Sequence, residues 1–293
     1  MTAADPPVLS GLVTGWFAAA ARDLPWRDPA AGPYAVLVSE VMLQQTPVAR
    51  VLPVYGSWLA RWPDVPALAA AEPGEAVRAW GRLGYPRRAL RLHAAARVMV
   101  ERHGGQVPRA VPELLALPGV GDYTARAVAA FAFRDREPVV DTNVRRVLAR
   151  AVQGRADAPV TRADLALMAA QLPADPEQAA QASAGWMELG ALVCTARSPD
   201  CPRCPLAARC AWLAAGRPTQ PPHRRPQPFA GTDRQVRGRL LQVLRDAPGP
   251  VAVTELAAAW DAAPQRDRAL DSLVADGLVD PLPDGRYALP GNG

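Results

Sequence analysis

The sequence predicts an all-α domain over residues 1–215 and a small winged-helix-like α+β module over residues 229–293. Short helical patterns follow one another from residue 34 to residue 193, with breaks at proline and glycine. An alternating, strand-like pattern occurs only near the C-terminus. Alanine, the strongest helix former, supplies much of the 49% hydrophobic fraction.

The first helix is expected to end before an extended Leu24-Pro25-Trp26-Arg27 segment. Later helices are expected over residues 142–153, 161–172 and 176–193. Residues 216–228 hold five prolines and three arginines, a composition typical of a linker.

Beyond the linker, helical spacing recurs over residues 233–246, 254–260 and 265–276. Residues 278–289 then alternate around a Pro283-Asp284-Gly285 turn, which indicates a β-hairpin. Three helices followed by a hairpin predict a winged-helix-like module.

The charge of the chain favours an acidic partner such as nucleic acid, because the formal net charge is +5. All 33 basic residues are arginine, since the sequence contains no lysine. Neither a long apolar run nor a basic, signal-like N-terminus occurs, so we expect a cytoplasmic protein without a membrane segment. In that reducing compartment, four cysteines indicate a metal site rather than disulfides.

Cys194, Cys201, Cys204 and Cys210 are separated by six, two and five residues. Four thiolates this close along the chain can surround one metal centre, either a [4Fe-4S] cluster or a zinc ion. Zinc sites usually have two close cysteine pairs, whereas only one pair here is close. The spacing therefore favours iron–sulfur and leaves zinc as the alternative.

The segment Leu117-Pro118-Gly119-Val120-Gly121 lies between two predicted helices. A Gly-x-Gly turn leaves main-chain N–H groups unshielded, and the N-terminus of the next helix adds positive potential. Together they would bind a DNA phosphate without reading sequence. An ordinary turn between two helices is the alternative.

Two carboxyls are candidates for acid–base chemistry. Glu40 lies among apolar residues, where burial would raise the pKa of a carboxyl and make it a competent acid; Gln44 and Gln45 indicate a polar pocket beside it. The alternative is a solvated glutamate on a helix face. Asp141 follows an extended segment and opens a helix, so it is either an N-cap, a cleft residue, or both.

These motifs together resemble the helix–hairpin–helix DNA glycosylases, and more closely the MutY-type adenine DNA glycosylases. The matching segments are residues 24–27, 39–46, 117–125, 140–147 and 188–191 with the cysteine loop. The resemblance implies a [4Fe-4S] cluster and two helical lobes with DNA between them. One lobe would span about residues 33–133; the other would join residues 1–32 to residues 134–215, with the cluster loop at 194–210.

The resemblance also implies the reaction. Adenine mispaired with 8-oxoguanine or guanine would be flipped out of double-stranded DNA. Glu40 would protonate the adenine ring at N7, Asp141 would stabilise the oxocarbenium ion, and Glu40 would then activate water. We expect a bacterial, monomeric enzyme that acts on nucleoid DNA.

Further site residues follow from the same resemblance. Tyr123 and Asn143 would orient Asp141 and the sugar. The adenine pocket would be shaped by Arg22, Leu24, Trp26, Arg27 and Gln45, of which Gln45 would also enter the DNA stack. DNA contacts are expected from Gln44, Tyr85, Arg87, Arg88, Pro118, Gly119, Val120, Gly121 and Thr124.

Three other functions compete with this one. Endonuclease III-type enzymes place a lysine nucleophile where this chain has Tyr123, and a chain without lysine cannot form a lysine Schiff base, which favours a monofunctional hydrolase. Thymine or uracil mismatch glycosylases share the fold, but Glu40 favours a purine whose ring nitrogen accepts a proton. A non-enzymatic DNA-binding regulator would use the linker and the C-terminal module.

The sequence departs from the resembled family at three places. Tyr85 is followed by Pro86 where many members have a second tyrosine, and Ala184 stands where members often have a polar residue. Residues 229–293 are too few for the larger C-terminal domain of many members. One hypothesis is that Arg234, Arg237 and Arg239 face DNA, the alternative being a solvated helix face.

Overall fold

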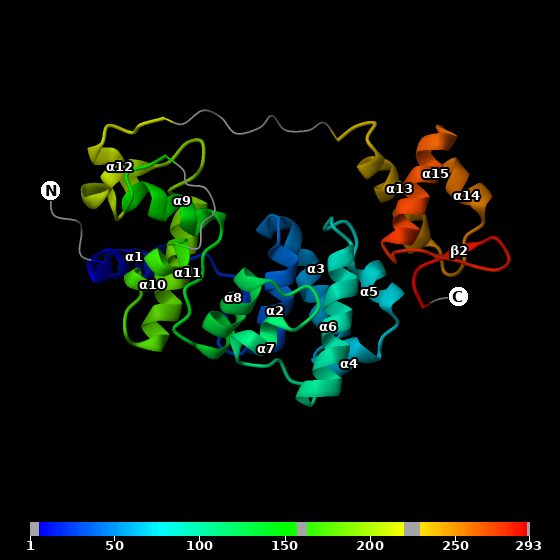
Figure 1. The fold of residues 1–293 in the computed structure, drawn as a ribbon, viewed down its shortest axis with the longest axis horizontal. Coiled ribbons are helices and arrows are strands. Elements are labelled where there is room, and N and C mark those ends of the chain that lie inside the picture. Colours follow the sequence, from blue (N-terminus) through cyan, green and yellow to red (C-terminus); the bar gives the residue numbers. More distant parts are fainter. Residues whose placement is uncertain (1–5, 157–162, 220–228, 292–293) are drawn as a thin grey trace. The chain divides into compact units, whose positions relative to one another are not determined.

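The computed structural model describes residues 6–156, 163–219 and 229–291, and is mostly helical in these ranges (Figure 1). Contacts divide the chain into two compact units, which we describe separately. The first, unit 1, contains residues 1–36, 109–115 and 120–223. The second, unit 2, contains residues 37–108, 116–119 and 224–293. The predicted linker lies outside the described residues from position 220 onward.

Unit 1 combines the N-terminal helix with helices from the middle and later parts of the chain. Its elements are α1 (Pro6–Ala20), a 3₁₀ turn η1 (Pro25–Arg27), α7 (Val111–Leu115), α8 (Asp122–Phe133), α9 (Thr142–Ala151), α10 (Ala163–Gln171), α11 (Pro176–Leu192), η2 (Cys201–Arg203), η3 (Ala207–Arg209) and α12 (Ala211–Ala214). The central helix is α11, which packs against α1, α8 and α9. A Cβ at Gly185 would lie 3.0 Å from Val13, so the missing side chain lets α1 approach closely.

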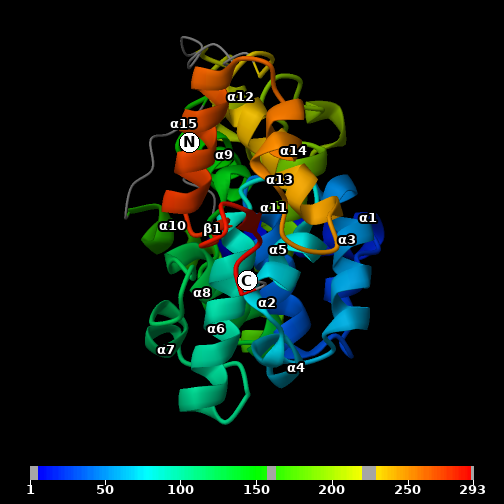
Figure 2. The same ribbon diagram turned by 90° about the vertical axis from the view of Figure 1, so that its right-hand side faces the viewer.

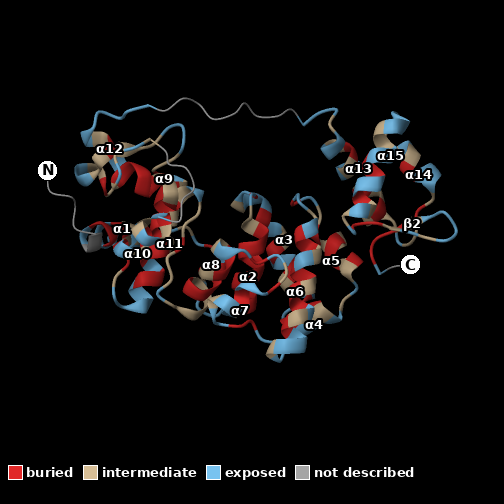
Figure 3. Ribbon diagram, in the orientation of Figure 1, coloured by how far each residue is buried: buried red, intermediate tan, exposed pale blue. Residues whose placement is uncertain are grey.

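Unit 2 begins within α2 (Gly32–Leu43) and continues through four helices and a C-terminal module. The helices are α3 (Val48–Arg61), α4 (Val65–Ala70), α5 (Pro73–Trp80) and α6 (Arg87–His103). The helix α6 packs against α4 and α5, and α2 carries a long buried stretch (Figure 3). In this core the ring of Trp58 meets those of Trp62 and Trp80 edge to face.

The C-terminal module confirms the predicted small winged-helix-like order. It contains α13 (Asp233–Asp246), α14 (Val253–Ala258), α15 (Ala263–Ala275) and an antiparallel pair, β1 (Asp280–Pro281) with β2 (Tyr287–Ala288). Val251 adds a single bridge to Tyr287.

The C-terminal module lies beside α5 (Figure 2), and hydrogen bonds to backbone carbonyl groups join the two. Arg78 donates to the Ala247 carbonyl at 2.8 Å, and Arg245 donates to the Val77 carbonyl at 2.9 Å. The Gly74 N–H donates to the Pro290 carbonyl at 2.7 Å. The module is therefore an integral part of unit 2.

One local prediction was wrong. Residues Leu24 to Arg27 do not form an extended segment, because Pro25 opens a 3₁₀ turn in which the Arg27 N–H donates to the Leu24 carbonyl at 2.8 Å. A proline at the first position of a turn fixes φ at a helical value, which favours this shape.

Candidate functional site

Glu40 lies in the middle of the apolar helix α2. Its side chain is only 5% exposed, and Val38, Ser39, Val41 and Met42 beside it are buried as well. The predicted burial of this carboxyl is thus found in the structure. Its proposed chemical role is taken up below.

Asp141 is the N-cap of α9 and is held by hydrogen bonds on both carboxylate oxygens. Oδ1 accepts from the Val144 N–H at 2.7 Å, and Oδ2 accepts from the Asn143 side-chain amide at 2.8 Å. Burial raises the pKa of Asp141, while these hydrogen bonds and nearby Arg146 act in the opposite direction. Asp141 is therefore a fixed, half-buried carboxyl rather than a solvated cap.

Arg146 extends this arrangement to the cysteine loop. It donates to the Asn143 side-chain carbonyl at 2.7 Å and to the backbone carbonyls of Gly190 and Cys194, both at 2.6 Å. A Cβ at Gly190 would lie 2.7 Å from both the Cβ and the carbonyl oxygen of Asn143. The glycine therefore lets α11 approach α9 and gives Arg146 its carbonyl acceptors.

Tyr123 lies in the same unit as Asp141. It packs on a small buried cluster of Ala127, Ala130 and Val139 at the start of the segment that leads to Asp141.

Arg22 and Arg27, which were predicted to shape a pocket, converge on the buried carboxylate of Glu188 in α11. The shortest ion-pair distances are 2.7 Å for Arg22 and 3.0 Å for Arg27. Burial would raise the pKa of Glu188, but the hydrogen bonds from both arginines more than offset it and hold the pKa at about 2. The two guanidiniums thus fix the N-terminal segment to α11, and Leu24 and Trp26 between them are buried.

The predicted hairpin has the conformation that its glycines allow. Gly119 has a φ of +80°, and a Cβ there would lie 2.7 Å from the Cβ of Arg91, so only glycine fits. Gly121 is the exposed N-cap residue of α8, with Pro118 half-buried, whereas Val120 and Thr124 are buried. Because Val120 and Thr124 are buried, any phosphate contact from them would come from their backbone.

The residues predicted to touch DNA in unit 2 differ sharply in exposure. Gln45 is exposed and Tyr85 is 54% exposed, and both adopt a left-handed backbone, with φ of +54° and +48°. Gln44 is half-buried. Arg87 is exposed and pairs with Asp276 of the C-terminal module at 3.1 Å.

Arg88, by contrast, is only 7% exposed, which argues against the predicted direct contact of its side chain with DNA. Arginines of the C-terminal module also have partners. Arg237 pairs with Asp276 at 2.6 Å, Arg234 lies over the ring of Phe229, and Arg239 lies over the ring of Trp260. Charge on Arg237 is thus largely neutralised within the module.

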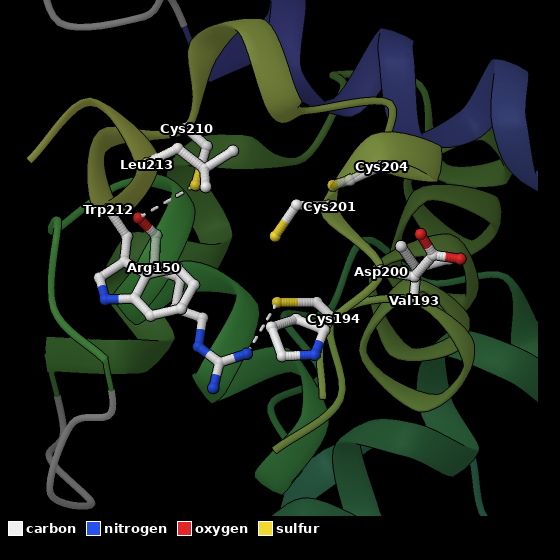
Figure 4. A pocket seen from close by; sticks show the side chains of 10 residues that line it. Arg150, Val193, Cys194, Asp200, Cys201, Cys204, Cys210, Trp212 and Leu213 are labelled. Carbon is white, nitrogen blue, oxygen red and sulfur yellow. Dashed lines mark hydrogen bonds between the residues drawn. The ribbon is translucent and has the colours of Figure 1, made fainter. Parts of the chain in front are cut away.

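All four cysteines line one pocket after the end of α11 (Figure 4). Among the described residues, no three cysteine, histidine, aspartate or glutamate side chains are gathered closely enough to hold a single metal ion. Burial, together with the neighbouring cysteines, raises the pKa of Cys204 to about 11. The side chains of all four cysteines thus face the same hollow.

Arg150 and Trp212 close one side of this pocket. Arg150 is buried, and its guanidinium lies 4.7 Å from the centre of the Trp212 ring. It donates to the Thr195 carbonyl at 2.7 Å and lies 3.5 Å from the Cys194 sulfur. A positive charge here would stabilise the negative charge of thiolate ligands.

Comparison with known proteins identifies the family of this chain. Residues 38–169 match the HhH-GPD superfamily of base excision DNA repair proteins. An adenine DNA glycosylase of Mycolicibacterium smegmatis is 57% identical over 279 residues, which cover 95% of this chain and 94% of that protein. The chain belongs to the adenine DNA glycosylase family. The human adenine DNA glycosylase is 42% identical, over 71% of this chain and 40% of its own length.

Solved structures show the same family fold. A thermostable thymine-DNA glycosylase superposes with a TM-score of 0.66 at 27% identity, over 72% of this chain and 97% of that one. A trapped endonuclease III–DNA covalent intermediate superposes with a TM-score of 0.63 at 25% identity, over 74% and 99%. No described helix is both long and apolar enough to cross a membrane.

Sequence reasoning assigned no role to Arg146 and Arg150, and it did not indicate that Glu188 pairs with two arginines. Each is a charged side chain that binds backbone carbonyls or a distant partner. Only the clustering of arginines at three- and four-residue intervals in α9 (Arg146 and Arg150) offered a signal, because such residues share a helix face.

Proposed function

We propose that the chain hydrolyses the N-glycosidic bond of adenine mispaired with 8-oxoguanine or guanine in double-stranded DNA. The observation that carries this proposal is Glu40, a buried carboxyl followed by two glutamines, in a chain 57% identical to a protein named adenine DNA glycosylase. The known structural relatives include endonuclease III bound to DNA, which supports duplex DNA as the substrate.

In the proposed mechanism, Glu40 donates a proton to N7 of the flipped adenine and so weakens the bond to the sugar. Asp141 stabilises the positive charge that develops on the sugar, and Asn143 fixes the carboxylate for this role. Glu40 then takes a proton from the attacking water. A lysine Schiff base cannot form because the chain has no lysine, so the reaction proposed is monofunctional.

We further propose that Cys194, Cys201, Cys204 and Cys210 hold a [4Fe-4S] cluster. When bound, such a cluster would tie the loop to α9 and α11 and would offer redox chemistry that the hydrolysis does not need. Arg150 would neutralise part of its negative charge, and Trp212 would shield it from water. The expected check is iron and sulfide content near four per chain, with a brown colour.

The decisive assay compares duplexes that contain adenine opposite 8-oxoguanine, adenine opposite guanine, and thymine opposite guanine. We expect release of adenine only, and loss of release in Glu40→Gln with DNA binding retained. Release of thymine alone, or persistent adenine release by Glu40→Gln, would contradict the proposal. If the chain binds DNA but releases no base from any duplex, the non-enzymatic alternative replaces it.

A further inference from the structure

Arg88, at the start of α6, is a buried arginine whose partners are two loops of unit 2. One loop follows α2 and contains residues 44–46, and the other contains residues 82–86 before α6. The first loop exposes the side chain of Gln45, and the second exposes those of Arg82 and Tyr85. We refer to Gln45 and Tyr85 as the two tips.

The guanidinium of Arg88 makes hydrogen bonds to both loops. One terminal nitrogen donates to the carbonyls of Val41, Met42 and Gln44 at 2.9, 2.9 and 2.6 Å. The other donates to the Thr46 hydroxyl at 2.9 Å and to the Gly84 carbonyl at 3.0 Å. A planar fork that binds five acceptors at once cannot be replaced by a single ammonium group.

Two of these acceptors, the carbonyls of Val41 and Met42, belong to the last turn of α2. The last carbonyls of a helix have no partner within the helix, and a cation there is also favoured by the helix dipole. Arg88 therefore completes the C-terminal turn of α2, the helix on which Glu40 lies. It links the tips to the same helix as the proposed acid.

Both tips have a strained backbone. Gln45 and Tyr85 are two of the four non-glycine residues with positive φ among the described parts of the chain. Such conformations cost free energy and persist only where surrounding contacts hold them, and they cluster at functional sites. Here Arg88 binds the residues on either side of Gln45 and the residue before Tyr85, and its guanidinium lies 5.6 Å from the centre of the Tyr85 ring.

The Arg88 side chain is held in place because it is buried and stacked. The Arg88 guanidinium lies 5.1 Å from the centre of the Trp80 ring, and the Trp80 indole N–H donates to the same Gly84 carbonyl at 3.0 Å. Burial lowers the pKa of Arg88 only to about 10, so the side chain keeps its charge at neutral pH. Burial of a charge without an ion pair is costly, and a fold keeps it where the hydrogen bonds are needed.

We propose that Arg88 is a positioning residue that holds the two tips, Gln45 and Tyr85, in fixed register with each other and with Glu40, so that they can enter the DNA stack together when adenine is extruded. This inference rests on the proposed function. Arg88 itself does not touch the DNA. Its contribution is to the extrusion of the base rather than to cleavage of the glycosidic bond.

The test uses the full-length chain with Arg88→Lys, which keeps the charge but loses the fork. The matched control is Arg245→Lys, a second arginine whose pKa burial lowers to about 10 and which binds a backbone carbonyl, away from the tips. Thermal melting reports how much stability each variant loses. Base release is measured in single turnover on a duplex with adenine opposite 8-oxoguanine, and on one with adenine opposite an abasic-site analogue.

On the duplex with adenine opposite 8-oxoguanine, we expect Arg88→Lys to release adenine about 10- to 100-fold more slowly than the original chain. Opposite the abasic analogue, where unpairing costs little, the deficit should shrink to within about threefold. In a Glu40→Gln background, 2-aminopurine next to the target adenine should brighten less when Arg88→Lys is added. For Arg245→Lys, the rate of adenine release should stay close to that of the original chain on both duplexes.

Three results would overturn the inference: normal extrusion by Arg88→Lys, an equal deficit on both duplexes, or an equal deficit in Arg245→Lys. The proposed function fails separately, because that failure requires the original chain to release no adenine from either duplex.

Discussion

Glu40 and Asp141 lie in different compact units and are surrounded by different kinds of contact. Glu40 lies within an apolar helix, and its buried neighbours are mainly hydrophobic. Asp141 lies at a helix N-terminus, where Val144 and Asn143 donate to its two oxygens and Arg146 binds Asn143 in turn. Glu40 is therefore controlled by exclusion of water, and Asp141 by a hydrogen-bond network that reaches the cysteine loop.

The largest expected effect comes from removing the charge of Asp141. Asp141→Asn should slow single-turnover adenine release by about 10³-fold or more, because a neutral amide cannot stabilise a developing cation. The melting temperature should change little, since asparagine is an equally good N-cap. Release within tenfold of the original rate would show that Asp141 serves only as a cap.

The next largest effect should follow from loss of the Glu188 carboxylate. Glu188→Gln leaves Arg22 and Arg27 without their buried partner and should destabilise the fold by about 2 kcal/mol at pH 7. The folded-state pKa of about 2 is below the unfolded value of about 4.3, so this stability is present above pH 4.3 and is lost as pH falls toward 2. Urea unfolding at several pH values measures it, and a difference that stays constant down to pH 2 would contradict the assignment.

A variant of Gly190 tests whether the hydrogen-bond network of Asp141, Asn143 and Arg146 depends on the close approach of α9 and α11. Gly190→Ala places a methyl group 2.7 Å from Asn143 and should cost about 1–3 kcal/mol of stability while also slowing base release. Gly56→Ala is the matched control, because a Cβ there meets nothing within 4 Å. Equal melting temperatures for the two variants would contradict the packing argument.

The smallest effect concerns the pH dependence of Asp141. Its hydrogen bond from Asn143 lowers a pKa that burial has raised, so Asn143→Ala should raise the pKa further. The carboxylate would then become protonated at a higher pH, and the acid limb of the single-turnover pH profile should move to higher pH, with release about tenfold slower at its plateau.

An acid limb that does not move in Asn143→Ala would indicate that another group controls this limb.

Met42→Leu is a control for the surroundings of Glu40. It keeps apolar volume beside that carboxyl and should change the rate of adenine release by less than about threefold.

The helices of the chain were predictable because their signals are local. Residues 233–246 were expected as a helix and form α13 with those bounds, and the Pro283-Asp284-Gly285 turn does join two short strands. The burial of Glu40 and the capping role of Asp141 also followed from adjacent residues. Such features depend on periodicity and turn chemistry, which a single sequence contains.

The roles of Arg88 and Arg22 were not predictable in the same way. Both were expected in the DNA or adenine site from the resemblance to the family, and arginine is usually exposed. Their partners are carbonyls more than 40 residues away for Arg88, and a carboxylate 166 residues away for Arg22. Only the tertiary structure brings such acceptors together, and burial then changes what the same residue type can do.

The bonds that join the C-terminal module to α5 also set an order of events during synthesis. Arg78 must wait for the carbonyl of Ala247, which lies 169 residues later in the chain. At a translation rate of about 5–20 residues per second, this partner emerges roughly 10–30 s after Arg78 itself. Unit 2 therefore cannot close until Ala247 has left the ribosome, and until then Arg78 lacks this backbone partner.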